Sequence, residues 1–435
     1  MNWKRKSERS WGRLGMRYKT EKLGKFLYIK GRIGWKGLKK SEYLEHSEYK
    51  IINGESLTKN GINWDKAGYI SKERYDESPE IMLQNEDILI SKDGTIGKLG
   101  FVENLSSKAT VASGIFVLRN LRSNLINTRF IYNYLSSSYF SKFIISRTEG
   151  SVIPHLYQKD FVELDFPLPS LEIQKKIVEI LDAISLKIKL NNAINNNLEQ
   201  QAVLLFKKWF IEFDNSSKNM LETRFGLVPE SFKLLKNGEL PLVVTDYVAN
   251  GSFASLKANV TLYQEPNYAY FIRNTDLKSG TFEVFVDEHS YNFLSKSTLY
   301  GGEIIISNVG DVGSVFLCPK LDKPMTLGNN IIMLRPEQEN LRYYLYIWFK
   351  WLYGQSLIQG IKGGSAQPKF NKTDFKNLPI FLPPDDLLEQ FHQIVKPMFE
   401  LINENNTENQ ALTRTRDTIL PRLMSGELDV SDIDF

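Results

Sequence analysis

The segment Lys92-Asp93-Gly94-Thr95-Ile96-Gly97-Lys98-Leu99 superficially resembles a loop that binds nucleotide phosphates. Such a loop reads G-x-x-x-x-G-K followed by Ser or Thr, whose hydroxyl holds Mg²⁺. Here the first glycine is misplaced and Leu99 replaces the hydroxyl residue. A similar segment further along the chain has Ser314 in place of Lys98. We therefore interpret both segments as turns between strands.

Residue types that hold metals or attack substrates are sparse. The single cysteine excludes an intrachain disulfide and a thiolate metal cluster, and it fits a reducing cytosol. The histidines lie far apart without ligand spacing. Motifs for dinucleotide binding, a serine nucleophile or a zinc protease are absent from the sequence. We expect a chain that is not an enzyme on its own and holds no metal or cofactor. The residues concerned are His46, His155, His289, His392 and Cys318.

Side chains suited to nucleic acid occur in two separate clusters. Basic residues contact phosphates, whereas Asn, Asp and Arg can bond base edges. The first cluster lies in Gly-punctuated segments between expected strands and consists of Arg32, Lys36, Lys39, Lys59, Asn60, Asn63, Trp64, Lys72 and Arg74. The second follows an aromatic strand and consists of Arg273, Asn274, Thr275, Asp276 and Lys278. The alternative interpretation of each single residue is a solvated surface loop.

Two further segments leave two interpretations open. They are Gly150-Ser151-Val152-Ile153-Pro154-His155 and Gly364-Ser365-Ala366-Gln367-Pro368-Lys369. Their backbone N–H groups could contact phosphates, or the segments could simply be turns that lead into helices.

The charge balance of the 435-residue chain is uneven. The whole chain has a net charge of +4, which is too small for a protein that holds nucleic acid by bulk charge. Residues 1–40 contain 14 Lys and Arg against two acids, so this segment carries +12 and the remaining chain −8. The opening of the chain is therefore a basic arm. Since no apolar run approaches the ~20 residues that span a bilayer, we expect a cytoplasmic protein without a membrane segment.

An internal repeat organises the chain. The segment Glu86–Gly97 matches Gly302–Gly313 at an offset of 216, and both predict a strand followed by a Gly-rich turn. At the same offset, Ser113–Arg119 matches Asn329–Arg335, a short apolar strand that ends in Arg. The chain is predicted to contain two copies of one mixed α/β unit.

Each copy ends in a long helix with a coiled-coil seam. In both helices apolar residues recur at alternating spacings of four and three, and the two patterns agree at an offset of 214. Asparagines interrupt both seams near their midpoints: Asn191, Asn195, Asn405 and Asn409. Pro397 inside the second helix predicts an early kink.

The asparagines restrict how the two helices can pair. Antiparallel packing about a pseudo-two-fold axis would place Asn191 opposite Asn409 and Asn195 opposite Asn405 as one polar layer that fixes the register. Parallel packing would also align the asparagines by type, so the pattern alone leaves both open. The roughly 165-residue domain between the helices favours the antiparallel arrangement, since a duplicated pair closes naturally as an isologous two-fold.

The predicted fold class is mixed α/β (α+β), with two similar globular domains joined by two long antiparallel coiled-coil helices in an internal pseudo-two-fold repeat. The predicted segments are a basic arm at 1–20, a first domain at 21–169, a first helix at 170–215, a second domain at 216–383, a second helix at 384–426 and a solvated acidic tail at 427–435. Two domains on a rigid pair of helices suggest a ruler along a nucleic-acid duplex.

Several motifs in their order and spacing carry a resemblance to a known family. They are the duplicated Asp87-Ile88-Leu89-Ile90-Ser91 with Gly94-x-Ile96-Gly97, Phe166 to Gln174 before the first helix, Leu204 to Asp214, and Arg416-Asp417-Thr418-Ile419-Leu420-Pro421-Arg422-Leu423-Met424-Ser425-Gly426-Glu427-Leu428. On these residues, nearly the whole chain resembles a specificity (S) subunit of a type I restriction-modification system. The N-terminal arm departs from the pattern and could touch phosphates, contact a partner or be disordered.

The resemblance implies a function in DNA recognition. The two domains would be target-recognition domains, each reading one half of a bipartite duplex DNA site, and the conserved helices would set the spacer and dock methyltransferase (modification) subunits. S-adenosylmethionine, ATP and Mg would belong to those subunits and to restriction (endonuclease and translocase) subunits. Adenine must leave the base stack to be methylated, so this chain would position a partner at a base it does not modify.

The alternative is a stand-alone two-headed DNA-binding regulator or scaffold. A subunit that docks partners needs exposed apolar surface on its helices away from their seam. The residues off the seam are Leu186, Leu190, Ile194, Leu204, Phe206, Phe210 and Phe213. Of these, we predict that Leu204, Phe206, Phe210 and Phe213 dock a partner.

Overall fold

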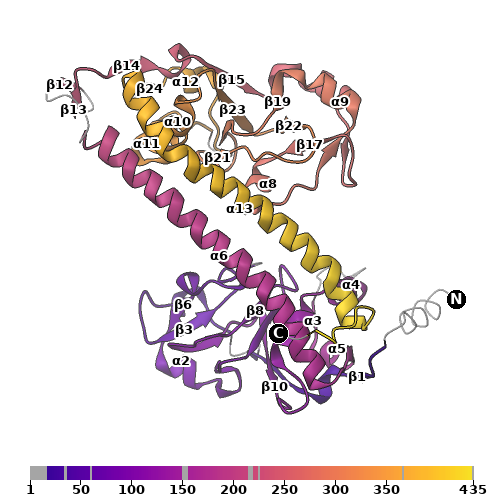
Figure 1. The fold of residues 1–435 in the computed structure, drawn as a ribbon. Coiled ribbons are helices and arrows are strands. Elements are labelled where there is room, and N and C mark those ends of the chain that lie inside the picture. The colour runs from indigo at the N-terminus through magenta and orange to yellow at the C-terminus, as the bar shows by residue number, and fades with distance from the viewer. Residues whose placement is uncertain are drawn as a thin grey trace. The chain divides into compact units, whose positions relative to one another are not determined.

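The computed structural model describes residues 17–33, 37–58, 61–148, 155–213, 219–223, 226–364 and 367–433. The chain divides into two compact units (Figure 1). Unit 1 consists of Met1–Leu190 and Asn409–Phe435, and unit 2 of Asn191–Glu408. Both boundaries lie inside the long helices, so each helix, predicted as a separate segment, contributes to both units.

A four-stranded antiparallel sheet forms the centre of unit 1. In sheet order its strands are β2 (Leu27–Gly31), β10 (Ile115–Asn120), β7 (Ile88–Ser91) and β8 (Leu99–Phe101). Strand β7 is buried along its whole length, which explains why its sequence is continuously apolar rather than alternating.

Unit 2 contains the same sheet in the same strand order. Its strands are β15 (Leu242–Asp246), β23 (Ile331–Pro336), β20 (Ile304–Ser307) and β21 (Val315–Leu317). A two-stranded sheet also recurs just before each long helix, as β1 (Thr20–Lys22) with β11 (Asp165–Pro167) and as β14 (Lys233–Lys236) with β24 (Pro379–Leu382). The predicted repeat is therefore a repeat of topology as well as of sequence.

The same buried ion pair stabilises the sheet in both units. In unit 1 the Arg119 Nε donates to Asp87 Oδ1 at 2.7 Å, and Nη2 donates to the carbonyl of Met82. In unit 2 the Arg335 Nη2 donates to Glu303 Oε1 at 2.9 Å and to the carbonyl of Thr298. All three positions differ by 216 between the units, so the repeat preserves the partners of the guanidinium as well as its position.

A second sheet has three strands in common between the units, since β6-β3-β9 corresponds to β18-β17-β22, and it differs in the outer strands. In unit 1 it has the order β6-β3-β9, and in unit 2 the order β16-β18-β17-β22-β19. Its central pair, β3 with β9 and β17 with β22, is parallel in both units. The strands are β3 (Tyr49–Ile52), β6 (Gly68–Ile70), β9 (Lys108–Val111), β16 (Leu262–Tyr263), β17 (Ala269–Ile272), β18 (Phe285–Val286), β19 (Thr298–Leu299) and β22 (Met325–Leu327). The two units therefore share a frame, which consists of the four-stranded sheet and the parallel strand pair. They differ in the strands and loops around this frame.

Short helices and hairpins complete each unit. In unit 1 they are α2 (Lys72–Asp76), α3 (Thr128–Leu135), α4 (Ser138–Thr148), α5 (Gln158–Val162) and the hairpin β4 (Leu57–Thr58) with β5 (Gly61–Ile62). In unit 2 they are α7 (Phe253–Asn259), α8 (Asn274–Ser279), α9 (Glu288–Phe293), α10 (Leu341–Lys350), α11 (Leu352–Gly360), α12 (Lys372–Lys376) and the hairpin β12 (Met220–Thr223) with β13 (Gly226–Pro229).

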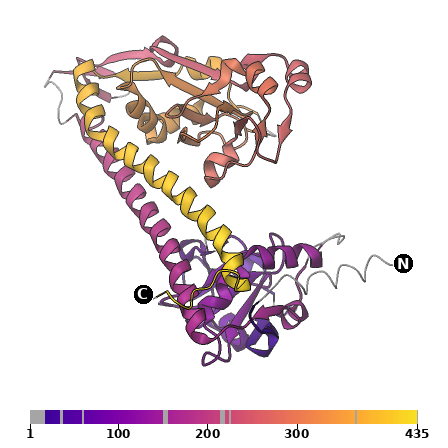
Figure 2. The same ribbon diagram turned by 45° about the vertical axis from the view of Figure 1, so that its right-hand side comes forward.

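Within each unit, segments of the two long helices, α6 (Leu171–Phe210) and α13 (Asp385–Ser425), pack antiparallel (Figures 1 and 2). In unit 1 the first part of α6 shares a core with the end of α13, through Ile177 and Leu423. In unit 2 the last part of α6 shares a core with the start of α13, through Ala202 and Phe391. This pairing of first with last excludes the parallel alternative and confirms the predicted fold class.

Asparagines meet in the seam. In unit 2 the Asn405 Nδ2 donates to Asn195 Oδ1 at 2.8 Å, and Asn195 donates to Asn406 at 3.0 Å. Asn191 is buried and donates to Glu408, the residue before Asn409, at 2.7 Å. A polar layer of this kind costs stability but specifies one register, because a shifted helix would leave amides without partners.

The second helix remains continuous through Pro397. Both views nevertheless show its first turns running in a different direction from the rest (Figures 1 and 2). A proline inside a helix lacks one N–H donor and crowds the preceding turn, which favours such a bend.

The acidic tail corrects the expectation of a solvated segment. Val430 is fully buried in the core of unit 1, and Leu428 packs against the same core. The Lys176 Nζ donates to the carbonyl of Ser431 at 2.7 Å. The two apolar side chains between the acids hold the tail on the domain. Residues 1–16 of the predicted arm lie outside the described residues, whereas the Arg17 N–H donates to the carbonyl of Ser425.

Replacing Arg119 with Ala should destabilise the four-stranded sheet of unit 1. Asp87 is fully buried, so the substitution leaves a buried carboxylate without its counter-charge, which costs about 3–5 kcal/mol. Hydrogen exchange of the β7 and β10 amides in the full chain should accelerate by on the order of a hundredfold or more, with the sheet of unit 2 as internal control. The exposed Arg122→Ala should change exchange little. Equal effects of the two variants would contradict a structural role for the ion pair.

Cysteines placed at 195 and 405 should form a disulfide readily, since the native side chains are in contact. The matched control pairs Asn195→Cys with Asn403→Cys, because residue 403 is exposed on another face of α13. Non-reducing electrophoresis measures the yield. Native Cys318 should not interfere because it is buried, which raises the pKa of its thiol. A higher yield for the control would show that the register is wrong.

Candidate nucleic-acid interface

A Gly-rich turn joins β7 to β8 in unit 1, at the segment that superficially resembles a phosphate loop. The Ser91 hydroxyl closes the turn by accepting from the Lys98 N–H at 2.8 Å and donating to the Thr95 carbonyl at 2.6 Å. Gly97 has a φ of 85°, a conformation that side chains other than glycine rarely adopt. The turn lies between antiparallel strands and not at the start of a helix, as our interpretation required.

Polar contacts connect this turn to two neighbouring segments. The Lys98 Nζ donates to the carbonyl of Gly54, in the loop that follows β3, at 2.8 Å. On the other side, Asp93 pairs with His155. The turn therefore lies beside the carboxyl end of the parallel strand pair, where loops gather and ligands bind in many α/β folds.

The equivalent turn of unit 2 joins β20 to β21 and contains Asp311. Its Oδ2 accepts from Lys278 at 2.5 Å and from Ser314 at 2.5 Å, with a longer contact of 3.4 Å from Asn274. Hydrogen bonds from Lys278 and Ser314 lower the pKa of the Asp311 carboxyl, so it is ionised at neutral pH. In both units the turn is thus bound to the segment that follows the central parallel strand.

Arg32 corrects the prediction of a DNA contact in unit 1. It is only 2% exposed, and its guanidinium donates to the Val111 carbonyl at 3.1 Å and to the Ser78 and Thr110 hydroxyls at 3.4 Å. Burial lowers the pKa of this guanidinium. Because its donors are directed into the domain, Arg32 ties strands together and cannot reach a base without unfolding the site.

The other unit 1 candidates have mixed outcomes. Lys36, Lys59 and Asn60 lie outside the described residues. Lys39 and Lys72 are exposed, and Lys72 pairs with Asp76. The remaining three have structural contacts: Asn63 caps a short 3₁₀ helix, Trp64 packs partly on an apolar core, and Arg74 pairs with Glu42 and Glu77.

The unit 2 candidates gather on helix α8. Asp276 is buried and accepts from the backbone N–H and the side chain of Arg273, so this pair closes the helix start. Thr275 and Lys278 are exposed and Asn274 is half-buried. Sequence reasoning missed Lys98, Asp311 and their contacts. The repeat alignment contained the signal, since it already paired the two turns.

Two segments had two open interpretations, a phosphate contact or a simple turn. The structure describes only parts of these segments. Residues 150–154, 365 and 366 lie outside the described residues. Near the second segment, the Gly310 N–H donates to the Pro368 carbonyl at 2.8 Å, and the Lys369 N–H donates to the Gly363 carbonyl at 2.9 Å. These bonds occupy two backbone N–H groups within the protein.

The partner-docking prediction on α6 is largely wrong. Phe206 and Phe210 are buried in the core of unit 2, where both pack against Tyr344 of α10, and Phe213 packs edge-on against Phe232. The reason is that α6 has two buried faces, one toward α13 and one toward the sheet domain. Leu204, 60% exposed, remains available.

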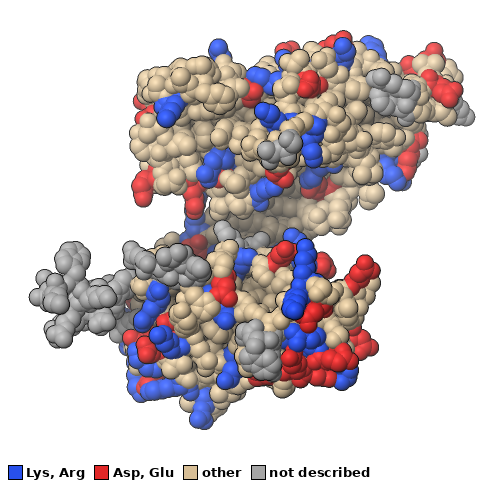
Figure 3. Space-filling view, turned by 180° about the vertical axis from the view of Figure 1, so that it is seen from behind, with Lys and Arg blue, Asp and Glu red and all other residues tan. Residues whose placement is uncertain are grey.

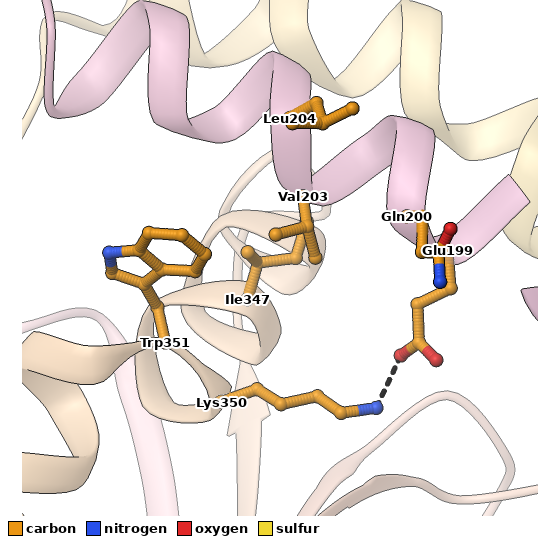
Figure 4. A pocket seen from close by; sticks show the side chains of 7 residues that line it. All are labelled: Glu199, Gln200, Val203, Leu204, Ile347, Lys350 and Trp351. Carbon is orange, nitrogen blue, oxygen red and sulfur yellow. Dashed lines mark hydrogen bonds and ion pairs between the residues drawn. The ribbon is translucent and has the colours of Figure 1, made fainter. Parts of the chain in front are cut away.

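Leu204 borders an apolar groove between α6 and α10 (Figure 4). The groove has a volume of ≈ 360 Å³ and is lined by Glu199, Gln200, Val203, Leu204, Ile347, Lys350 and Trp351. At one rim, Glu199 Oε1 accepts from Lys350 Nζ and from the Tyr346 hydroxyl, each at 2.5 Å. The ion pair and the hydrogen bond connect α6 to α10 at this rim. The apolar lining of the groove between the two helices remains exposed.

Surface charge is mixed on the face of each unit that Figure 3 shows. On the face drawn in Figure 3, Lys and Arg side chains are interspersed with Asp and Glu in each unit, without one uniformly basic surface. Such a surface suits selective contacts more than a strong general attraction to phosphate.

Comparison with known proteins decides the family. Residues 18–200 and 246–414 match the family described as type I restriction modification DNA specificity domain. The chain belongs to this family. The two matched segments correspond to the two copies of the repeat, which agrees with the duplicated topology.

Relatives of the specificity-subunit family support the assignment along most of the chain. The MjaIX specificity subunit of Methanocaldococcus jannaschii is 25% identical over 313 residues, 70% of each chain. The HindI specificity subunit of Haemophilus influenzae is 24% identical over 407 residues, 80% of this chain and 87% of the relative. The crystal structure of the type I restriction-modification S subunit from M. genitalium covers 94% of this chain and 97% of that one, with 16% identity and a TM-score of 0.52. At that identity the structural likeness concerns the fold.

As a type I specificity subunit, the chain recognises DNA and is not itself an enzyme. Within the described part of the chain, no group of three His, Cys, Asp or Glu could hold a metal ion. Over the same residues, no helix is long and apolar enough to cross a membrane.

Proposed function

We propose that this specificity subunit reads a bipartite duplex DNA site, one half with each globular domain. The observation that carries the proposal is the duplicated frame. The four-stranded sheets agree in strand order, and their ion pairs agree in every partner, while the second sheets differ in strand number. Two heads that share a frame and differ around it suit two different half-sites at a fixed separation.

The long helices would set that separation. Helix α6 contains 40 residues, which corresponds to ~60 Å at 1.5 Å per residue. Asparagines hold the register of the helix pair, and its length would fix the number of base pairs between the half-sites.

We further propose that the groove beside Leu204 receives an apolar segment of a modification subunit. An exposed leucine next to an open apolar wall is the kind of surface that a permanent partner covers. A stand-alone regulator would leave this wall in water, so the groove favours the subunit over the regulator. Restriction subunits would join through the modification subunits.

Catalysis would then lie entirely with the partners. S-adenosylmethionine, ATP and Mg would bind to the modification and restriction subunits, and the assembled complex would act on DNA in the cytoplasm. This chain would contribute the choice of site and the position of the partner on the duplex.

Exchanging residues 216–383 for the second domain of another specificity subunit should change one half of the recognised sequence and leave the other half intact. The physical reason is that each domain has an apolar cluster made only of its own residues, and its own surface loops. Sequencing of methylated sites in a host with the complete system measures the outcome. The reciprocal exchange of residues 21–169 should change the other half. A change of both halves in either chimera would refute modular reading.

Replacing Leu204 with Lys should weaken assembly with modification subunits roughly tenfold or more, because a charge would enter an apolar contact. Co-purification and mass photometry of mixed subunits measure assembly. The control is Leu262→Lys on β16, since Leu262 is also exposed and belongs to the same unit. Both variants should melt like the parent. Unchanged assembly of Leu204→Lys would rule out the groove as a docking site.

A further inference from the structure

The parallel strand pair makes the two units comparable residue by residue. Ile52 pairs with Val111 in unit 1, and Ile272 pairs with Leu327 in unit 2. The partners Val111 and Leu327 differ by 216, the same offset as the Gly-rich turns. Gly54 and Asn274, two residues further on, therefore occupy equivalent positions beside equivalent turns.

In unit 1 the turn supplies the donor. Lys98 reaches from the turn to the Gly54 carbonyl at 2.8 Å, and one of its three ammonium protons makes this bond. The space beside Gly54 is open, since a Cβ built there meets nothing within 4 Å. The ammonium is thus held in place with donor capacity remaining.

In unit 2 the turn supplies the acceptor. Ser314 replaces Lys98, and Asp311 occupies the position of Thr95. The Asp311 carboxylate accepts from Lys278 and Ser314 and is 43% exposed. A carboxylate offers about four lone-pair sites, so acceptor capacity remains at this edge. The same two segments are bridged in both units, but the hydrogen-bond polarity at the turn is reversed.

We propose that these bridges are specificity-determining contacts that read equivalent positions of the two half-sites with opposite hydrogen-bond polarity. Lys98 donates to the acceptor edge of guanine, which presents O6 and N7 in the major groove. Asp311 accepts from an exocyclic amino group, as cytosine N4 and adenine N6 provide. Their intramolecular bonds hold both groups before DNA arrives, which reduces the entropy lost on binding. This inference rests on the proposed bipartite reading.

The test uses the full chain assembled with its modification subunits. A DNA library that varies each base of both half-sites measures relative binding for Lys98→Met and Asp311→Asn. Methionine keeps the length of the lysine without its donors, and asparagine keeps the shape of the aspartate but supplies an amide donor. Lys98→Met should relax the preference for guanine at one position of one half-site by roughly 10- to 100-fold. Asp311→Asn should relax or reverse the preference at one position of the other half-site by a similar factor.

The controls are Lys108→Met in unit 1 and Lys296→Met in unit 2, both exposed lysines outside the turns. They should leave every base preference unchanged. The proposal is overturned if Lys98→Met and Asp311→Asn weaken binding to all sequences equally, or if both alter the same half-site. A parent complex whose preferences do not fall into two half-sites would instead overturn the proposed function.

Discussion

The antiparallel seam between α6 and α13 is the interaction on which the rest of the structure depends. Neither globular domain closes its core with its own sequence repeat alone. The core of unit 1 contains Leu420, Leu423 and Met424 from the end of the second helix. The core of unit 2 contains Ala202, Phe206 and Phe210 from the end of the first. Each half of the chain therefore completes the other, and loss of the seam would expose apolar surface in both.

The seam also has a defined register. Apolar packing along a helix is tolerant of sliding by a turn, because many side chains of similar size can replace one another. Amides are less tolerant, since a shifted Asn195 or Asn405 would lose its partner inside a largely apolar seam. Apolar packing thus holds the two helices together without specifying their register, and the polar layer selects one register.

The two copies of the repeat agree in their buried contacts and differ at their turns. The ion pairs of Arg119 and Arg335 and the parallel strand pairs hold the same loops at the same edge in both units. Around that frame, Lys98 in one turn corresponds to Ser314 in the other, and Thr95 to Asp311. Thr95 and Asp311 are exposed, and substitutions at exposed positions usually cost little stability.

The sequence by itself determined the duplication, the two long helices and the seam with its asparagines, because these depend on local periodicity. It also identified the family, since the motifs occur in a fixed order. Only the tertiary structure decided the relative direction of the two helices. It also decided which individual polar and aromatic side chains are buried. Phe206 lies off the seam in sequence, yet it is buried because α10 covers a second face of the helix. Arg32 has the composition of a DNA contact, yet carbonyl and hydroxyl groups from residues 46 or more positions away surround it. Such partners come from distant parts of the chain, and no local pattern in the sequence records which of them will meet.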